Sequence, residues 1–213
     1  IESVSVNTLM RGEIITLQKW ISQVPDQVIN TRALICICRA WIYNISGELQ
    51  KVEPEVSKAE FAVRDSQKRY NETEVANIKG HIVLLRSYYF SPFYTGNPDN
   101  ILKHRKLLLE AKANLQTDSP IIFSILELVI GGTYFFTCEW KPSIEAFKAA
   151  QYYGEISGNH LVTYAAINNQ AEILIFQGKL REAYHLVSTT INETTIKYGR
   201  LFPPLSFVYL SMG

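Results

Sequence analysis

Apolar residues recur along most of the chain at intervals of three and four positions, the spacing of one face of an α-helix. In the segment 179–198, for example, Leu180, Ala183, Tyr184 and Val187 fall on one stripe. The pattern therefore predicts an all-α protein. Its helices are expected at 2–11, 13–24, 30–46, 48–69, 74–91, 99–114, 119–137, 140–157, 160–177, 179–198 and 203–212.

Four predicted turns, at Gly47, Asp99, Cys138 and Gly178, divide this pattern into units with spacings of 52, 39 and 40 residues. The first spacing is longer because Pro92 must end or kink the helix before the second turn. Units of about 40 residues at a regular period are typical of helical repeat proteins.

Residue size repeats around three of these turns. Small residues lie seven positions before the turn, at Ala40, Gly131 and Ala171. Larger residues lie four positions before it and nine after it, at Tyr43, Tyr134, Leu174, Val56, Phe147 and Val187. Small residues let two helices approach closely while the larger ones fill the space between them. We therefore expect a TPR-like superhelical solenoid of stacked antiparallel hairpins, forming one domain over 1–213 with about four hairpins and unpaired end helices.

The apolar ends of the chain suggest a piece of a longer protein, because solenoids normally cap their ends with polar faces. The alternative is that the ends dimerise. Residues 121–138 contain only one charged side chain, Glu127, and could be mistaken for a membrane span. We instead expect a buried central helix, because Gly131 and Gly132 lie inside the stretch and it fits the repeat register.

Composition narrows the function. Hydrophobic residues make up 47% and charged residues 19% of the chain, as in a packed globular protein. The formal net charge of +1 provides no general attraction to nucleic acid or to an anionic membrane. We therefore expect no membrane partner, and DNA contact only through a separate domain.

The sequence contains none of the common catalytic or metal-binding motifs. No P-loop, GxGxxG, HExxH, CxxC or GxSxG pattern occurs, and the four histidines are far apart in sequence. The three cysteines, Cys36, Cys38 and Cys138, are expected to be reduced and structural, which suits a cytoplasmic protein with no secretory signal. We expect no enzymatic activity and no cofactor in this segment.

The segment 11–59 carries the most specific pattern, in Gly12-Glu13, Trp20, Val24-Pro25, Ala40-Trp41 and Gly47. It resembles the helical region of MalT-like regulators, the large ATP-binding regulators of the LuxR family. Segments 132–159 and 170–187 resemble later hairpins of the same family. This sequence departs from the family pattern where Cys138 replaces a glycine and where a proline is missing near Thr31–Ala33.

The resemblance implies a parent protein with a nucleotide-binding switch domain, this solenoid and a DNA-binding helix-turn-helix. In such regulators the solenoid is the sensor, which binds a small-molecule inducer or a regulatory protein and couples that event to self-association. ATP would then bind only the switch domain, and DNA only the helix-turn-helix. The alternatives are a TPR-type adaptor that docks a peptide or protein, and an oligomerisation scaffold.

A ligand is expected on the concave side, which the first helix of each hairpin lines. Aromatic faces beside hydrogen-bonding groups suit sugars, other small polar ligands and extended peptides alike, although such aromatic residues often only pack. The candidate residues are Trp41, Asn44, His81, Tyr88, Asn168 and Glu172. Asn168 and Glu172 are the strongest pair, because two polar residues one turn apart have no packing reason to lie on an apolar helix.

Overall fold

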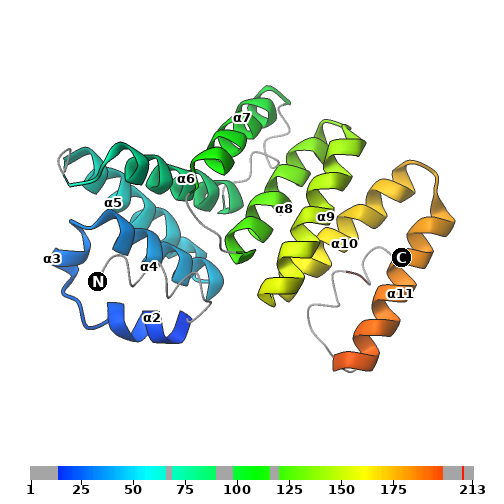
Figure 1. The fold of residues 1–213 in the computed structure, drawn as a ribbon, viewed down its shortest axis with the longest axis horizontal. Helices are drawn as coiled ribbons and strands as arrows, with labels where there is room; N and C mark the ends of the chain where they lie inside the picture. Colours follow the sequence, from blue (N-terminus) through cyan, green and yellow to red (C-terminus); the bar gives the residue numbers. More distant parts are fainter. Residues whose placement is uncertain (1–13, 66–68, 90–97, 116–119, 199–207, 209–213) are drawn as a thin grey trace. The chain divides into compact units, whose positions relative to one another are not determined.

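The computed structural model describes residues 14–65, 69–89, 98–115, 120–198 and 208. Within them the chain forms α-helices, one 3-10 turn and no strand, so the predicted all-α class is confirmed (Figure 1). The helices are α2 (Ile14–Ile21), α3 (Asp26–Ile29), α4 (Ala33–Ile45), α5 (Val52–Asp65), α6 (Glu72–Tyr89), α7 (Pro98–Asn114), α8 (Pro120–Phe136), α9 (Trp140–Ser157), α10 (His160–Phe176) and α11 (Leu180–Tyr198), with the 3-10 turn η1 at Leu49–Lys51. The predicted helix 2–11 lies outside the described residues, as does 203–212 apart from Val208.

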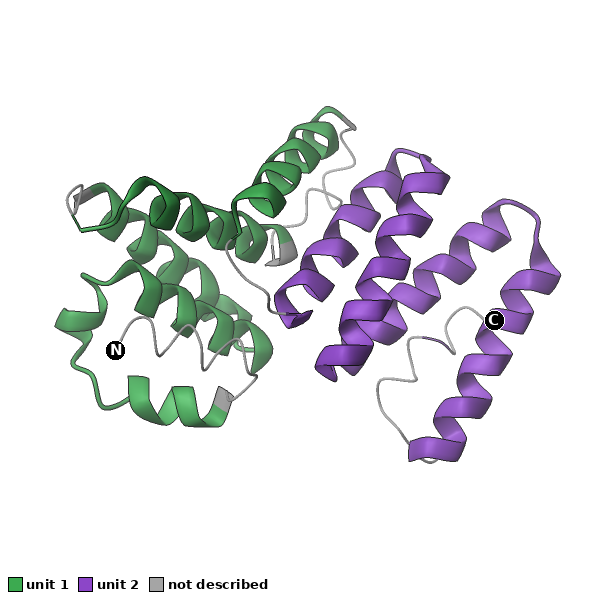
Figure 2. Ribbon diagram, in the orientation of Figure 1, with its two compact units in different colours: residues 1–119 green, residues 120–213 purple. Residues whose placement is uncertain are grey.

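Two compact units divide the chain, unit 1 over residues 1–119 and unit 2 over residues 120–213 (Figure 2). Each unit is described by itself below. The expectation of a single domain over 1–213 stays a prediction.

Unit 1 contains α2–α7, and its helices from α4 onward pack in succession: α4 on α5, α5 on α6 and α6 on α7. The start of α6 is fixed by a reciprocal cap, in which the Glu74 backbone N–H donates to Asn71 Oδ1 and the Asn71 N–H donates to Glu74 Oε2, both at 2.9 Å. The short helix α3 was not predicted from the sequence. It begins directly after Pro25, whose φ of −58° suits a helix start.

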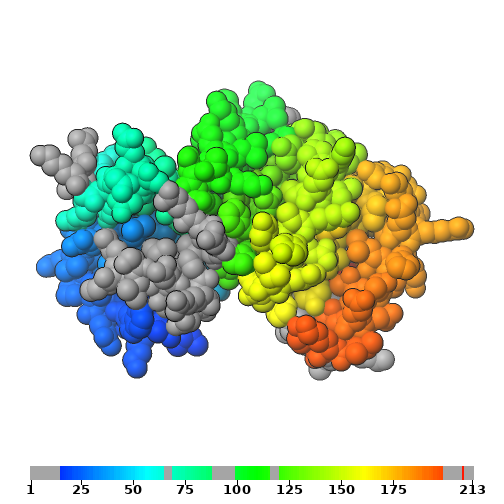
Figure 3. Space-filling model, in the orientation of Figure 1, coloured from blue at the N-terminus to red at the C-terminus, as the bar shows by residue number. Residues whose placement is uncertain are grey.

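Unit 2 repeats the same arrangement, with α8 on α9, α9 on α10 and α10 on α11, and with a further contact between α8 and α10. In Figure 3 the surface of this unit passes from the green and yellow side chains of α8–α10 to the orange side chains of α11. Sequential antiparallel neighbours are therefore observed in both units, as the hairpin pattern predicted.

Helix α8 is the apolar stretch that could have been mistaken for a membrane span. Nine of its residues are buried, among them Leu126, Glu127 and Gly131, which confirms the expectation that this helix is buried. Of the helices in the described part of the chain, none has both the length and the apolarity that a bilayer crossing requires.

The same backbone motif closes three hairpins. Gly47, Cys138 and Gly178 have φ of 76°, 58° and 73°. Each lies two residues after the end of a helix, and the following N–H donates to the carbonyl five residues back, as in a Schellman cap. These bonds join Glu48 to Tyr43 at 2.8 Å, Glu139 to Tyr134 at 2.9 Å and Lys179 to Leu174 at 2.8 Å.

The predicted turn at Asp99 is displaced by a few residues. Asp99 lies within the first turn of α7, which begins at Pro98. A proline at the first helical position has no N–H to leave unpaired, and an acidic residue in the first turn favours the helix dipole. Pro98 and Asp99 therefore start a helix rather than close a hairpin.

Candidate functional site

Helix α10 lies between α9 and α11, and both pack against it. Side chains of these three helices line two hollows that follow one another along α10, one at its C-terminal half and one at its N-terminal half. We call the surface that holds both hollows the α10 groove. It lies wholly within unit 2.

The larger hollow, here called the basic hollow, has a volume of about 650 Å³. That volume falls in the range of about 300–1,000 Å³ that is usual for small-molecule sites. Its apolar lining comes from all three helices, with Ile144 on α9, Leu174 on α10 and Leu186 on α11. Leu186 is itself packed against the core of the unit at Val187. The hollow therefore has an apolar lining anchored to the core.

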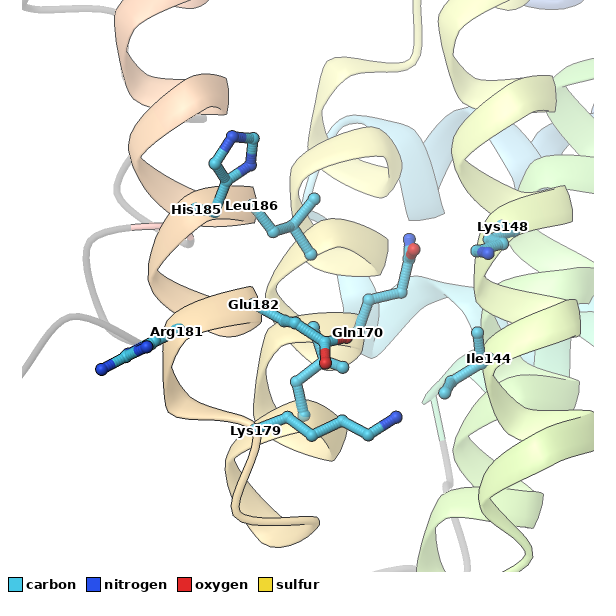
Figure 4. A pocket seen from close by; sticks show the side chains of 9 residues that line it. Ile144, Lys148, Gln170, Lys179, Arg181, Glu182, His185 and Leu186 are labelled. Atoms are coloured by element: carbon cyan, nitrogen blue, oxygen red, sulfur yellow. The ribbon is translucent and has the colours of Figure 1, made fainter.

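Charged residues surround this lining. Lys148, Lys179, Arg181 and Glu182 border the basic hollow, giving three permanent cations and one carboxylate. Figure 4 shows the Lys179 side chain extended toward α9, whereas the Arg181 guanidinium points away from it. Within the described residues, none of these four side chains takes part in an ion pair or hydrogen bond. The excess positive charge around the hollow is therefore not neutralised by a neighbour.

A polar chain crosses the α10 groove between its two hollows. Gln170, which is only 6% exposed, donates from Nε2 to Gln151 Oε1 at 3.0 Å and to the Ala166 carbonyl at 3.3 Å. Gln151 donates in turn to Glu155 Oε1 at 2.9 Å. Both Nε2 protons of Gln170 are thereby used, and no donor among the described residues reaches its Oε1. Gln170 thus presents a hydrogen-bond acceptor to the basic hollow.

The second hollow is smaller, about 250 Å³, and its charges are mixed. Glu155 and Glu193 border it together with Lys197. At its wall the Tyr164 and Thr194 hydroxyls share a hydrogen bond of 2.9 Å, and both side chains are buried. This hollow is thus bordered by two carboxylates and one ammonium group, in contrast to the basic hollow.

Unit 1 has a hollow of about 400 Å³ beside Val24 and Pro25, part of the segment that carries the family resemblance. Among its described lining residues the one cationic group is Arg39, which donates to Asp26 at 2.7 Å and also pairs with Glu55 at 3.2 Å. Because Arg39 is already held by two carboxylates, this hollow offers a ligand less unpaired charge than the basic hollow does.

Two predicted site residues, Asn168 and Glu172, are brought together on α10. Asn168 Nδ2 donates to Glu172 Oε1 at 2.9 Å, and both side chains are partly exposed. Asn168 lies two residues before Gln170, about 200° around the helix axis. The pair therefore faces away from the α10 groove. Asn168 Oδ1 is buried and has no hydrogen-bond partner among the described residues.

Trp41 and His81 occupy the core of unit 1. Trp41 is 0% and His81 1% exposed. Trp41 Nε1 donates to His81 Nδ1 at 3.3 Å, and the two rings meet edge to face with centroids 6.3 Å apart. Burial lowers the pKa of His81 to about 4, because the charged imidazolium is poorly solvated there. The two side chains are therefore buried and contact each other between α4 and α6.

The remaining two predicted residues also lie in unit 1. Asn44 is buried on α4, and its Nδ2 has no hydrogen-bond partner among the described residues. Tyr88 lies on α6, but its side chain is outside the described residues. Four predicted residues thus belong to unit 1 and two to unit 2. A ligand role for any of the six stays a prediction.

Sequence reasoning missed the residues of the basic hollow. Lys148, Lys179 and Glu182 come from two helices and a turn, and each alone resembles an ordinary solvated side chain. One local signal was present: Gln170 is a polar residue eight positions before the turn at Gly178, directly beside the small repeat residue Ala171. A polar side chain next to a helix-contact position indicates that it lies where helices meet.

The cysteines and the acidic groups give no sign of a metal centre. In the part of the chain that the structure describes, no three His, Cys, Asp or Glu side chains lie close enough to hold a metal ion. Cys36, Cys38 and Cys138 form no disulfide, and the first two are buried whereas the third is exposed. Burial raises the pKa of the Cys36 thiol to about 12, so it is protonated and unreactive at neutral pH.

No family model matches the chain. No curated protein and no solved structure matches it either. The likeness to MalT-like regulators therefore rests on the residues of the sequence alone.

Proposed function

We propose that the chain is a TPR-like helical solenoid that acts as a binding and regulatory module. In this proposal it is the sensor region of a MalT-like regulator in the cytoplasm, and it carries out no reaction itself. It binds a small-molecule inducer or regulatory partner and couples that binding to self-association. ATP and DNA belong to other domains of the same regulator.

The observation that carries the proposal is the basic hollow. A space of about 650 Å³ with an apolar lining and a few polar groups has the character of a ligand site. The hollow is made where three helices meet, so an occupant would contact α9, α10 and α11 at once. Binding there would stiffen the packing of successive hairpins, which is a direct way for a helical array to pass on a signal.

A second candidate, docking of a protein partner, is favoured by a different feature of unit 2. Trp140 and Phe176 stack with centroids 5.9 Å apart, and Phe135 meets both rings edge to face. Phe176 is 67% exposed and Phe136 52% exposed. Exposed aromatic clusters of this kind are enriched at protein interfaces.

The test is thermal unfolding of the 213-residue chain against a panel of sugars, short-chain metabolites and amphipathic small molecules. A ligand that binds only the folded state raises stability by about 2.7 kcal/mol at a hundredfold excess over its dissociation constant. We expect at least one compound to raise the midpoint. If no compound in any class does so, and Phe176→Ser abolishes capture of a protein partner, the adaptor function replaces the sensor function.

Two double variants then locate the site, because they lie on opposite sides of α10. Lys148→Gln/Lys179→Gln changes the basic hollow, and Asn168→Ala/Glu172→Ala removes the pair on the other face. We expect the first to reduce the midpoint shift and the second to leave it unchanged. The reverse result would place the ligand at the pair that the sequence pointed to. Lys141→Gln, on the exposed surface of α9 and outside the hollow, is the matched control.

A further inference from the structure

In the basic hollow, the charged groups and the apolar surface occupy separate parts of the lining. Ile144, Leu174 and Leu186 supply apolar contact, and two lysines border the hollow. Lys148 projects from α9, and Lys179 extends toward it from the turn between α10 and α11 (Figure 4). A ligand resting on the apolar lining would therefore meet both lysines at the border of the hollow.

We infer that the basic hollow binds a small amphipathic anion, a molecule with an apolar body and a single carboxylate or similar acidic group. This inference rests on the proposed function and names the chemical class of its ligand. The inference rests on charge complementarity: Lys148 and Lys179 bring two positive charges to the hollow and Glu182 one negative charge, and none of the three is paired within the described residues.

Several cations of unit 1 are paired with carboxylates, unlike the lysines of the basic hollow. In unit 1, Arg86 pairs with Glu53 at 2.8 Å and with Glu60 at 3.1 Å, and Lys58 pairs with Glu55 at 2.7 Å. Those cations have their counter-charges within the fold. The lysines of the basic hollow have no such counter-charge within the described residues, so an incoming acid group would not have to displace an internal ion pair.

The Glu182 carboxylate would repel a bound anion, so removing it tests the charge of the ligand. It lies in the first turn of α11, among the same lining residues as the lysines. If the ligand is an anion, removing this carboxylate must strengthen binding. If the ligand is instead a zwitterion, whose ammonium group pairs with Glu182 and donates to Gln170 Oε1, the same change must weaken binding. The direction of the change in affinity therefore distinguishes an anionic ligand from a zwitterionic one.

The experiment is isothermal titration calorimetry of the 213-residue chain with octanoate. The neutral 1-octanol and the cationic octyltrimethylammonium serve as probes with the same apolar chain. We expect octanoate to bind more tightly than either of them. Its dissociation constant should rise with ionic strength, because exposed charges are screened by salt.

Three variants of exposed residues test the geometry without disturbing the core. Lys148→Gln and Lys179→Gln should each weaken octanoate binding by about two- to fivefold, the range that an exposed ion pair provides. Glu182→Gln should strengthen it by a similar factor. Lys141→Gln, on the same helix as Lys148 but outside the hollow, should leave it unchanged.

Several outcomes would overturn the inference. Equal affinity for octanoate and octanol, or no saturable heat with octanoate, would show that the hollow does not select an amphipathic anion. Weaker binding in Glu182→Gln would assign a zwitterion instead. This inference can fail while the proposed function holds. If a neutral compound raises the unfolding midpoint, and the shift persists in Lys148→Gln/Lys179→Gln, the sensor function is supported but an anionic ligand is ruled out.

Discussion

Gly131 of α8 lies so close to Phe147 of α9 that a Cβ atom at Gly131 would stand 2.6 Å from the Phe147 ring. Real Cβ atoms do not approach neighbours so closely, so the two helices meet at this distance only because residue 131 has no side chain. Ser143 reinforces the contact by donating from Oγ to the Gly131 carbonyl at 2.9 Å. The small and large positions that the repeat pattern paired are thus in direct contact.

Gly131→Ala should therefore destabilise the chain, by about 1–3 kcal/mol, the usual cost of overpacking a core. The loss should appear although alanine is intrinsically the better helix former by about 1 kcal/mol. Denaturant unfolding would measure it. The control is Phe147→Leu in the Gly131→Ala background, where the smaller side chain should recover part of the loss. A Gly131→Ala chain at least as stable as the wild type would contradict the close approach.

Cys138 occupies a left-handed position, with φ of 58°, that glycine fills at the equivalent turn Gly178. A side chain in this conformation costs roughly 1–2 kcal/mol. Cys138→Gly should therefore stabilise the chain by roughly 0.5–1 kcal/mol, after the greater freedom of glycine in the unfolded chain is counted. Gly178→Ala is the mirror experiment and should destabilise by about 1 kcal/mol. Opposite signs in thermal unfolding are the expected result, and equal signs would contradict it.

The Trp41–His81 pair predicts a loss of stability in mild acid. An unfolded histidine has a pKa near 6.5, whereas burial lowers the pKa of His81 to about 4. Between these values the unfolded chain binds a proton that the folded chain does not, so stability falls as the pH falls from about 6.5 to 4. The full effect of this residue is about 3 kcal/mol.

Urea unfolding at several pH values would measure this loss. The matched variant is His81→Gln, which keeps an acceptor for the Trp41 N–H and cannot gain the proton. Its stability should depend less on pH in this window than that of the wild type. Parallel curves for the two chains would show that His81 does not titrate as its burial requires.

Thiol labelling should distinguish the three cysteines. Cys138 is exposed, whereas Cys36 and Cys38 are buried, and Cys36 donates to the Ile29 carbonyl at 3.2 Å. We expect one thiol per chain to react rapidly with an aromatic disulfide reagent at pH 8, and all three after denaturation. In Cys138→Ser the fast phase should vanish. A fast phase that remains in this variant would contradict the burial of Cys36 and Cys38.

Much of the fold could be predicted from the sequence because its signals are local. The turns at Gly47, Cys138 and Gly178 follow from the spacing of small, large and cap residues, and the structure places the same backbone bond at each. The helix α3 was missed because four residues after Pro25 are too few to show a periodicity. Asp99 was misplaced because a helix start and a turn favour similar residues.

The candidate site was harder to predict, since its residues are assembled by packing. Trp41 and His81 were assigned to a groove from their positions on the first helices of their hairpins. The structure shows that these positions face each other where α4 meets α6. Lys148 and Lys179 are 31 residues apart in the sequence. They border the same hollow only because α9 and the α10–α11 turn both contribute to its lining.

The central claim is that the chain binds a small molecule and leaves it unchanged. The most direct measurement is a calorimetric titration with whichever compound raises the unfolding midpoint, followed by recovery and chemical analysis of that compound. We expect saturation at one ligand per chain, weaker binding in Lys148→Gln/Lys179→Gln, and recovery of the compound intact. Absence of saturable binding, or conversion of the compound to a product, would contradict it.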